Sequence, residues 1–86
     1  MYNYTICNQA DASLFYRQCK ALEDRIDGLQ EKRFLEDVDG TAIREYTHPN
    51  GSVVVKNDCQ VDALYVSSDF DLRRYFLSND TGTTIQ

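Results

Sequence analysis

The sequence predicts an α+β fold in which one long amphipathic helix packs on an antiparallel sheet. Apolar residues recur at spacings of four, three, four and three, which is the pattern of a helix with one buried face. This stripe consists of Phe15, Cys19, Leu22, Ile26 and Leu29. The segment from Tyr2 to Cys7 alternates as a strand does, and three turn signals divide the chain after the stripe. The predicted order is β-α-β-β-β, with a three- or four-stranded sheet and a short C-terminal helix.

The long helix follows the first strand. Asn8, Asp11 and Ser13 are each suited to cap its N-terminus, because their side-chain oxygens accept backbone N–H groups. Beyond Leu29 the spacing meets charged residues, so the helix is expected to end between residues 28 and 32, with Gly28 as a candidate terminator.

The turn signals place the remaining strands. Asp39-Gly40 predicts a two-residue hairpin turn of the primed type, since glycine accepts a positive φ. Residues 48–51, His-Pro-Asn-Gly, predict a type I turn with Gly51 at a bulge position. Residues 57–60 form a looser polar turn. Candidate strands therefore lie near residues 33–38, 41–47, 52–57 and 61–66.

Pairing across the second turn sets Thr47 opposite Val53 and Tyr46 opposite Val54. One face of the sheet, the predicted floor for the helix, then holds Ile43, Thr47, Val53 and Val55. The other face is half polar, as expected of an antiparallel sheet with one wet side, and holds Arg44, Tyr46, Val54 and Lys56.

A second, short helix is predicted near the C-terminus. Ser68, with Asp71 three residues later, resembles a capping box with a shorter acid. Leu72, Tyr75 and Phe76 would then close the core. We expect a single domain over residues 1–78 and a flexible tail over residues 79–86.

Composition limits the function classes. The 86 residues carry 14 acids and nine Lys or Arg residues, for a net charge of −5, which argues against direct binding of nucleic acid. No stretch approaches the roughly 20 apolar residues of a membrane helix, and no secretory signal is visible. Cys7, Cys19 and Cys59 lack metal-ligand or disulfide spacing, so reduced thiols in a cytoplasmic protein without cofactor or metal are expected.

Residues 34–41 resemble the nucleophile motif of haloacid-dehalogenase-type phosphatases, an aspartate followed two residues later by Asp-Gly-Thr. The resemblance implies Asp37 as nucleophile and Asp39 as acid/base and magnesium partner, on a doubly wound parallel sheet in a chain roughly twice this length. Here a long helix precedes the motif where that family has a strand. Asp-Gly is also a common hairpin turn, so we interpret the segment as a turn and predict a protein that is not an enzyme.

Two surfaces are candidates for a protein partner. Tyr65 is expected to join Tyr46 on the half-polar sheet face, rimmed by Arg44 and Lys56 beside Val54, because Tyr and Arg are enriched in protein interfaces. The alternative is that Tyr65 turns inward and Tyr46 only pairs across strands. The second surface is an acidic run from Glu23 to Asp39 that would imitate DNA phosphates or else form a solvated helix and turn. Its partner-binding candidates are Glu36, Asp37 and Asp39.

These features predict a small acidic inhibitor that binds a protein of a nucleic-acid-handling complex, of the phage or mobile-element type, as anti-CRISPR and anti-restriction proteins do. The partner would be a basic nucleic-acid-binding protein. An immunity or antitoxin protein that binds one cognate toxin is the alternative, and a magnesium phosphatase is a third class. A monomer or weak homodimer is expected, because the four-three spacing would also suit a helix pair between two subunits.

Overall fold

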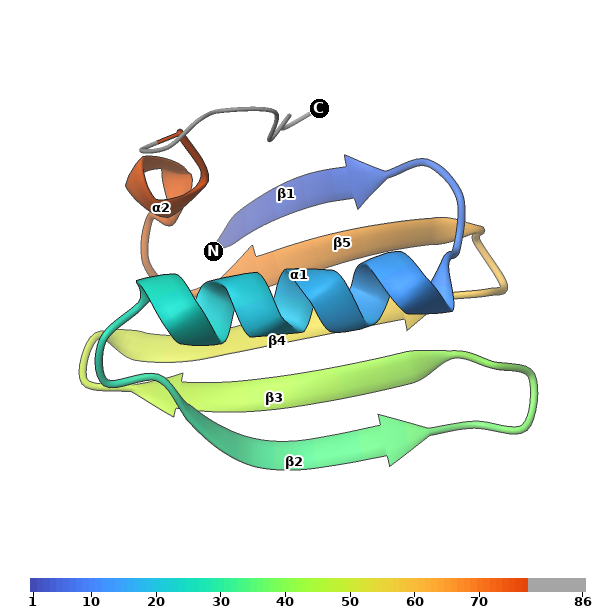
Figure 1. Cartoon of the computed structure of the whole chain (residues 1–86), viewed down its shortest axis with the longest axis horizontal. Coiled ribbons are helices and arrows are strands. Elements are labelled where there is room, and N and C mark those ends of the chain that lie inside the picture. The colour runs from blue at the N-terminus through green and yellow to red at the C-terminus, as the bar shows by residue number, and fades with distance from the viewer. Residues whose placement is uncertain (78–86) are drawn as a thin grey trace.

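The computed structural model describes residues 1–77, which form a five-stranded antiparallel sheet with one long helix across one face (Figure 1). The strands are β1 (Tyr2–Cys7), β2 (Gln30–Glu36), β3 (Ala42–His48), β4 (Gly51–Asp58) and β5 (Ala63–Ser68). Their order across the sheet is β1-β5-β4-β3-β2. The predicted α+β antiparallel class is confirmed. The predicted count of three or four strands is too low, because β1 joins the same sheet by pairing with β5, the last strand.

The long helix, α1 (Ala12–Arg25), begins and ends at identifiable residues. Asp11 is its N-cap, and its carboxylate accepts the Leu14 N–H at 3.0 Å. The helix ends at Arg25, earlier than predicted, because Ile26 is already extended with φ −103° and ψ 106°. Gly28, at φ +84°, then lies in the turn that follows instead of closing the helix itself.

The apolar stripe is longer than the helix that it predicts. Phe15, Cys19 and Leu22 are buried from within α1. Ile26 is only 1 % exposed although it follows the last helical residue, and Leu29 packs partly against the same core. The stripe is therefore occupied by the protein's own sheet and is not available for the helix pair considered between subunits.

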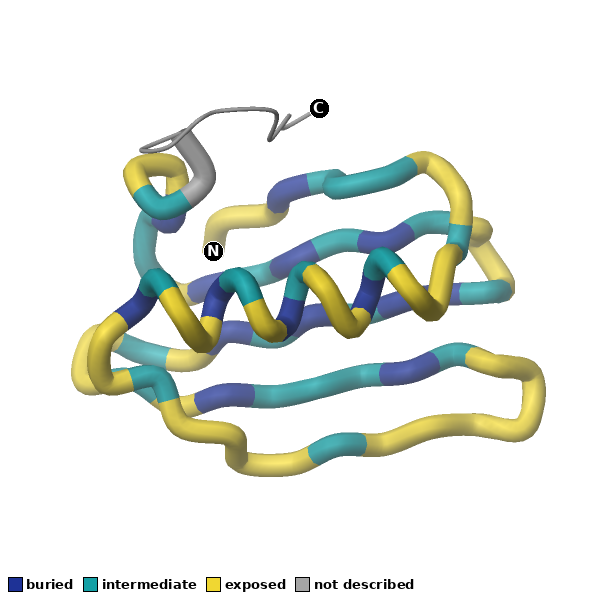
Figure 2. The backbone as a smooth tube through the Cα atoms, in the orientation of Figure 1, coloured by how far each residue is buried: buried dark blue, intermediate teal, exposed yellow. Residues whose placement is uncertain are grey.

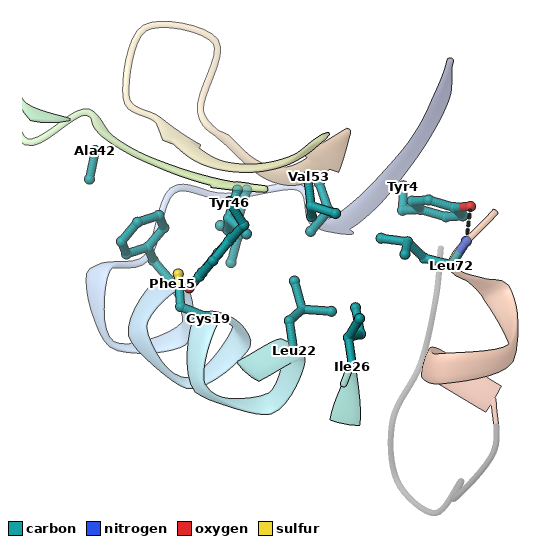
Figure 3. Close-up of a cluster of buried hydrophobic side chains, with 12 residues drawn as sticks. Tyr4, Phe15, Cys19, Leu22, Ile26, Ala42, Tyr46, Val53 and Leu72 are labelled. Atoms are coloured by element: carbon teal, nitrogen blue, oxygen red, sulfur yellow. Dashed lines mark hydrogen bonds between the residues drawn. The ribbon is translucent and has the colours of Figure 1, made fainter. Parts of the chain in front are cut away.

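The core lies in a single layer between α1 and the sheet. In Figure 2 the buried segments of the strands lie behind the helix, and Figure 3 shows the side chains that fill this space. The buried apolar residues are Tyr4, Phe15, Cys19, Leu22, Ile26, Ala42, Tyr46, Val53, Val55, Leu64, Val66 and Leu72. The opposite face of the sheet carries no helix among residues 1–77 (Figure 1).

The predicted register of the β3–β4 hairpin is wrong by one residue. Tyr46 pairs with Val53, and His48 pairs with Gly51, so only Pro49 and Asn50 form the loop. Gly51 stays in the strand ladder instead of forming a bulge. Since successive residues of a strand point to opposite faces, the slip exchanges the two faces of β3. Arg44 and Tyr46 lie beneath the helix with Val53 and Val55, whereas Ile43 and Thr47 share the uncovered face with Val54 and Lys56.

The β2–β3 hairpin also differs from its prediction. Asp37–Gly40 form a four-residue turn, in which the Gly40 N–H donates to the Asp37 carbonyl at 3.1 Å and the Asp37 N–H donates to the Thr41 carbonyl at 2.8 Å. Gly40 has φ +93° but Asp39 does not have a positive φ, which excludes the type I′ turn that needs both. The strand before it, β2, begins three residues earlier than the predicted range of 33–38, because the helix ends earlier.

The second helix, α2 (Arg73–Leu77), begins later than the Ser68 cap predicts. The Ser68 hydroxyl accepts the Phe70 N–H at 3.1 Å within a bend, and the Asp71 carboxylate accepts the Arg73 N–H at 2.9 Å at the helix start. Leu72 is fully buried, and the Tyr4 hydroxyl accepts its N–H at 2.7 Å (Figure 3). This bond fixes the C-terminal segment to β1.

Four further expectations concern residues at the C-terminal end. Tyr75 packs against the core as predicted. The side chain of Phe76, the domain limit at residue 78 and the predicted tail of residues 79–86 lie outside the described residues. Among residues 1–77, neither helix is long and apolar enough to cross a membrane.

Candidate functional site

Three loops that are distant in the sequence meet at one end of the sheet (the right of Figure 1). They connect β1 to α1, β2 to β3, and β4 to β5. Hydrogen bonds tie them together: the Ala10 N–H donates to the Asp62 carboxylate at 2.8 Å, and the Cys59 N–H donates to the Thr41 hydroxyl at 3.1 Å. The three loops therefore form one surface.

This surface carries all of the protein's excess negative charge. We call it the acidic end, and its acids are Asp11, Glu36, Asp37, Asp39, Asp58 and Asp62. No Lys or Arg occurs in residues 7–12, 36–42 or 58–63. The rest of the chain holds eight acids against nine bases, so it is close to neutral. A charge distribution divided in this way orients a charged partner toward one end of the molecule.

Most of these carboxylates also hold the loops in place. Asp37 accepts the Val38 N–H at 2.8 Å, and Asp39 accepts the Thr41 N–H at 2.9 Å. Asp58 accepts the N–H groups of Gln60 and Val61 and pairs with Lys56 at 3.3 Å. Desolvation opposes ionisation of Asp58, but these hydrogen bonds and Lys56 lower the pKa of its carboxyl. These bonds hold the carboxylates of Asp37, Asp39 and Asp58 in position on their loops.

Apolar side chains are exposed among the acids. Val38 at the tip of the β2–β3 turn and Val61 in the β4–β5 loop are 102 % and 65 % exposed. Leu35, near the end of β2, is 48 % exposed. Next to it lies a shallow pocket of about 210 Å³, lined by Leu35, Glu36, Asp37, Thr41 and Ile43. The acidic end therefore combines charge with contact area that a partner would bury.

The uncovered sheet face brings together three of the five residues predicted there. Val54, Lys56 and Tyr65 share this face, and Lys56 lies directly opposite Tyr65. Contact with the Asp58 carboxylate, together with Tyr65, raises the pKa of Lys56. The alternative in which Tyr65 turns inward is therefore wrong.

Arg44 and Tyr46, the other two residues predicted on that face, lie on the helix side of the sheet. Tyr46 is 1 % exposed, and its hydroxyl donates to the Glu23 carboxylate of α1 at 2.6 Å. Burial and this hydrogen bond raise the pKa of Tyr46. Neither the Tyr46 ring nor its hydroxyl is accessible to a partner, so this part of the predicted surface is corrected.

Arg44 bridges α1 and the edge of the sheet. Its guanidinium nitrogens lie 3.5 Å from a carboxylate oxygen of Glu23 and 3.7 Å from one of Glu31. The guanidinium carbon, Cζ, lies 4.7 Å from the centre of the Phe34 ring. These contacts join the β2–β3 hairpin to the helix, and the side chain is only 19 % exposed. These contacts within the fold account for the position of Arg44, and no binding partner is needed to explain it.

His48 and the acids of the phosphatase-like motif lie far apart and are each bonded to backbone groups of nearby loops. The Asn50 N–H donates to His48 Nδ1 at 3.0 Å, and His48 Nε2 lies 3.0 Å from the Asp27 carbonyl, so the ring ties two loops at the opposite end of the sheet. Asp37 and Asp39 each accept a backbone N–H within their own turn. The sheet is antiparallel, whereas the resemblance implies a parallel one. Within the described part of the chain, no three His, Cys, Asp or Glu side chains are grouped to hold a metal ion.

Sequence reasoning identified three acids of this end, Glu36, Asp37 and Asp39, but missed Asp11, Asp58 and Asp62. Alternate connections of an antiparallel sheet emerge at the same end, so the first, third and fifth connections of this chain meet. Adding the charges of alternate connections would have found the whole set.

Comparison of the chain with models of protein families, with curated proteins and with solved structures finds no match.

Proposed function

We propose that this protein is a non-enzymatic binding protein whose acidic end engages a basic surface of a protein that handles nucleic acid. In this role it would inhibit its target, as anti-CRISPR and anti-restriction proteins of phages and mobile elements do. The observation that carries the proposal is the collection of six acids on three loops at one end. The loops themselves contain no Lys or Arg, and among residues 1–77 only Asp58 of the six is paired with a cation, Lys56 of β4.

Electrostatics favour this type of partner. A groove that binds nucleic acid is lined by Lys and Arg, and carboxylates on an opposing surface attract it as phosphates do. Five of the six acids accept backbone N–H groups, four from the loops and one from the first turn of α1, so little conformational entropy is lost when the surface is bound. The exposed side chains of Val38 and Val61 would add apolar contact area at the same place.

The test compares two variants with equal net charge. The first carries Glu36→Gln, Asp39→Asn and Asp62→Asn at the acidic end, and the amide oxygens retain the capping bonds. The control carries Asp24→Asn, Asp27→Asn and Asp69→Asn elsewhere. Each protein is immobilised, partners are captured from host lysate and identified by mass spectrometry, and the affinity for the purified partner is measured at several salt concentrations.

We expect the wild type to retain a basic nucleic-acid-binding protein that added nucleic acid displaces. Its affinity should fall as salt rises, since screening weakens attraction between exposed charges. The acidic-end variant should bind about ten-fold or more weakly, whereas the control should remain within about two-fold of the wild type. Equal losses in both variants would contradict the proposal, and a single toxin as partner would favour the immunity alternative. Turnover of a phosphate ester that Asp37→Asn abolishes would instead favour the phosphatase.

A further inference from the structure

Strand β2 is one edge of the sheet, and some of its backbone groups face away from β3. No described strand lies beyond it (Figure 1). The Asp37 N–H donates to the carbonyl of Thr41, the residue directly opposite, so these two residues form a hydrogen-bonded pair. In an antiparallel ladder such pairs alternate with pairs that are not hydrogen-bonded to each other. The N–H and C=O groups of Phe34 and Glu36 therefore point outward from the sheet.

The two halves of β2 differ as edges. The register with β3 shifts between Glu31 and Arg33, which leaves Lys32 in a bulge. A lysine and a bulge both protect an edge strand from pairing with another chain. From Arg33 to the turn at Asp37 the register does not shift again. This second half is therefore a regular edge with outward backbone groups.

The side chains of the second half are complementary to a second copy of themselves. Arg33, Leu35 and Asp37 alternate onto the uncovered face of the sheet. Leu35 is 48 % exposed and lies opposite Ile43 of its own sheet. If two copies run antiparallel with Leu35 at a two-fold axis, each Arg33 lies opposite Asp37 of the other copy. Opposite charges then flank an apolar pair.

From this geometry we infer that the second half of β2 pairs with the same segment of a second copy and forms a homodimer with one continuous sheet. In this register Phe34 of each copy lies opposite Glu36 of the other. The outward groups of these two residues exchange two hydrogen bonds, and the two-fold axis repeats them. The contact is shorter than a standard interface, so the dimer is weak.

Both members of the ion pair have capacity left for a second copy. Among residues 1–77, Arg33 donates through one nitrogen, Nη2, to the Glu45 carboxylate. Its side chain is 55 % exposed, and its remaining N–H groups suit a second carboxylate. Asp37 accepts the Val38 N–H through Oδ1, which leaves Oδ2 for Arg33 of the second copy.

Two neighbouring registers also match the outward backbone groups but fit less well. Centring the dimer on Phe34 sets Arg33 opposite Leu35, so both ion pairs are lost, and it draws the bulge into the ladder. Centring it on Glu36 sets two Glu36 side chains opposite each other, and like charges directly opposite are destabilising. The side chains therefore select the register centred on Leu35.

The first experiment follows association of the whole chain by analytical ultracentrifugation and by amide chemical shifts. We expect a monomer at about 5 μM and an increasing fraction of dimer toward about 1 mM, with the largest shifts at residues 33–37. Glu36→Pro removes an outward N–H and no hydrogen bond to β3. It should weaken dimerisation about ten-fold or more, whereas Glu36→Ala should remain within about two-fold of the wild type.

The second experiment exchanges the charges. Arg33→Glu sets acids opposite each other at both contacts, and Asp37→Lys sets cations opposite each other. Each variant alone should dimerise about ten-fold or more weakly than the wild type. An equimolar mixture of the two should recover to within about three-fold, because the mixed dimer has opposite charges at both contacts. Recovery also shows that both variants are folded.

Lys20→Glu and Asp24→Lys make the same changes of charge on the exposed side of α1 and are the controls. Each should dimerise within about two-fold of the wild type. No association up to about 1 mM, undiminished association of Glu36→Pro, or a charge-exchange mixture no stronger than its components would each overturn the inference. Concentration-dependent shifts centred on β1 or α1 would also overturn it. Capture of a basic protein tests the proposed function separately.

Discussion

Gly51 begins β4 at a position where a side chain has no room. Its φ is +139°, and a Cβ built on it would lie 2.6 Å from the Cβ of Asp69. Asp69 is held there because its carboxylate accepts the Ser52 N–H at 2.9 Å and its own N–H donates to the Ser52 carbonyl at 3.0 Å. The close approach of two backbones, and not only the turn, therefore requires glycine at this position.

We expect Gly51→Ala to lower the free energy of unfolding by about 2–3 kcal/mol, measured by urea denaturation. Gly28→Ala is the matched control. Gly28 also has a positive φ, +84°, but its added Cβ would meet Pro49 at an ordinary 3.6 Å. Gly28→Ala should lower the free energy of unfolding by about 1 kcal/mol, because only the cost of a positive φ for alanine applies there. Equal losses would show that contact with Asp69 does not contribute.

Tyr46 gives the stability a dependence on alkaline pH. Its pKa is raised from 10.0 by burial and by the hydrogen bond to Glu23, so the folded protein keeps the Tyr46 proton at pH values where the unfolded chain loses it. The resulting contribution to stability is fully present below about pH 10 and is lost as the pH rises above it. The loss is about 1.4 kcal/mol per pH unit for one proton.

Tyr46→Phe should therefore reduce the slope of the free energy of unfolding between about pH 10 and pH 11.5. At neutral pH the variant should be less stable by about 1–2 kcal/mol, because a hydrogen bond to a charged group is lost. Denaturation at a series of pH values measures both effects, and Tyr65→Phe on the uncovered face is the control. A slope unchanged by Tyr46→Phe would contradict the assignment.

The secondary-structure elements show what the sequence could and could not predict. The alternation of residues 2–7 located β1 to its exact bounds, and the stripe of Phe15, Cys19 and Leu22 located the buried face of α1. The end of α1 was missed because burial continues after the helix: Ile26 fills the core from an extended residue. Periodicity reports burial, and it does not by itself report where the backbone stops being helical.

The sequence predicted where the hairpins lie but not the register in which their strands pair. The turn at residues 48–51 was identified, yet the choice between a two-residue loop and a bulge at Gly51 depends on Asp69, which is 18 residues away in the sequence. A slip of one residue exchanges the faces of a strand, and so it moved Tyr46 and Arg44 from the candidate surface into the core. Val54 and Lys56 lie on the predicted face, as does Tyr65, for which the sequence had also left the inward position open. Side chains alternate between the two faces along β4 and β5.

At the scale of the whole molecule, topology determines both the charged surface and the folding order. The three acidic loops meet only because five antiparallel strands return their alternate connections to one end (Figure 1). Strands β2 to β5 are joined by successive hairpins, whereas β1 must find β5 across nearly the whole chain, as the pairing of Tyr2 with Ser68 shows. Closing so long a loop costs entropy, so non-local pairing is slow and is expected late in folding.

We therefore expect substitutions in the hairpins and in β1 to affect different rates. Val55→Ala, at a fully buried position of β4, should cost about 2 kcal/mol and slow refolding about five-fold. Tyr4→Phe removes the acceptor for the Leu72 N–H and the donor to Asp71 at 3.0 Å, and it should cost about 1–2 kcal/mol. Because these bonds join β1 to the last segment, their loss should accelerate unfolding and leave refolding within about two-fold of the wild type. Stopped-flow refolding and unfolding in urea measure both rates, and slower refolding of Tyr4→Phe than of Val55→Ala would place β1 in the folding nucleus instead.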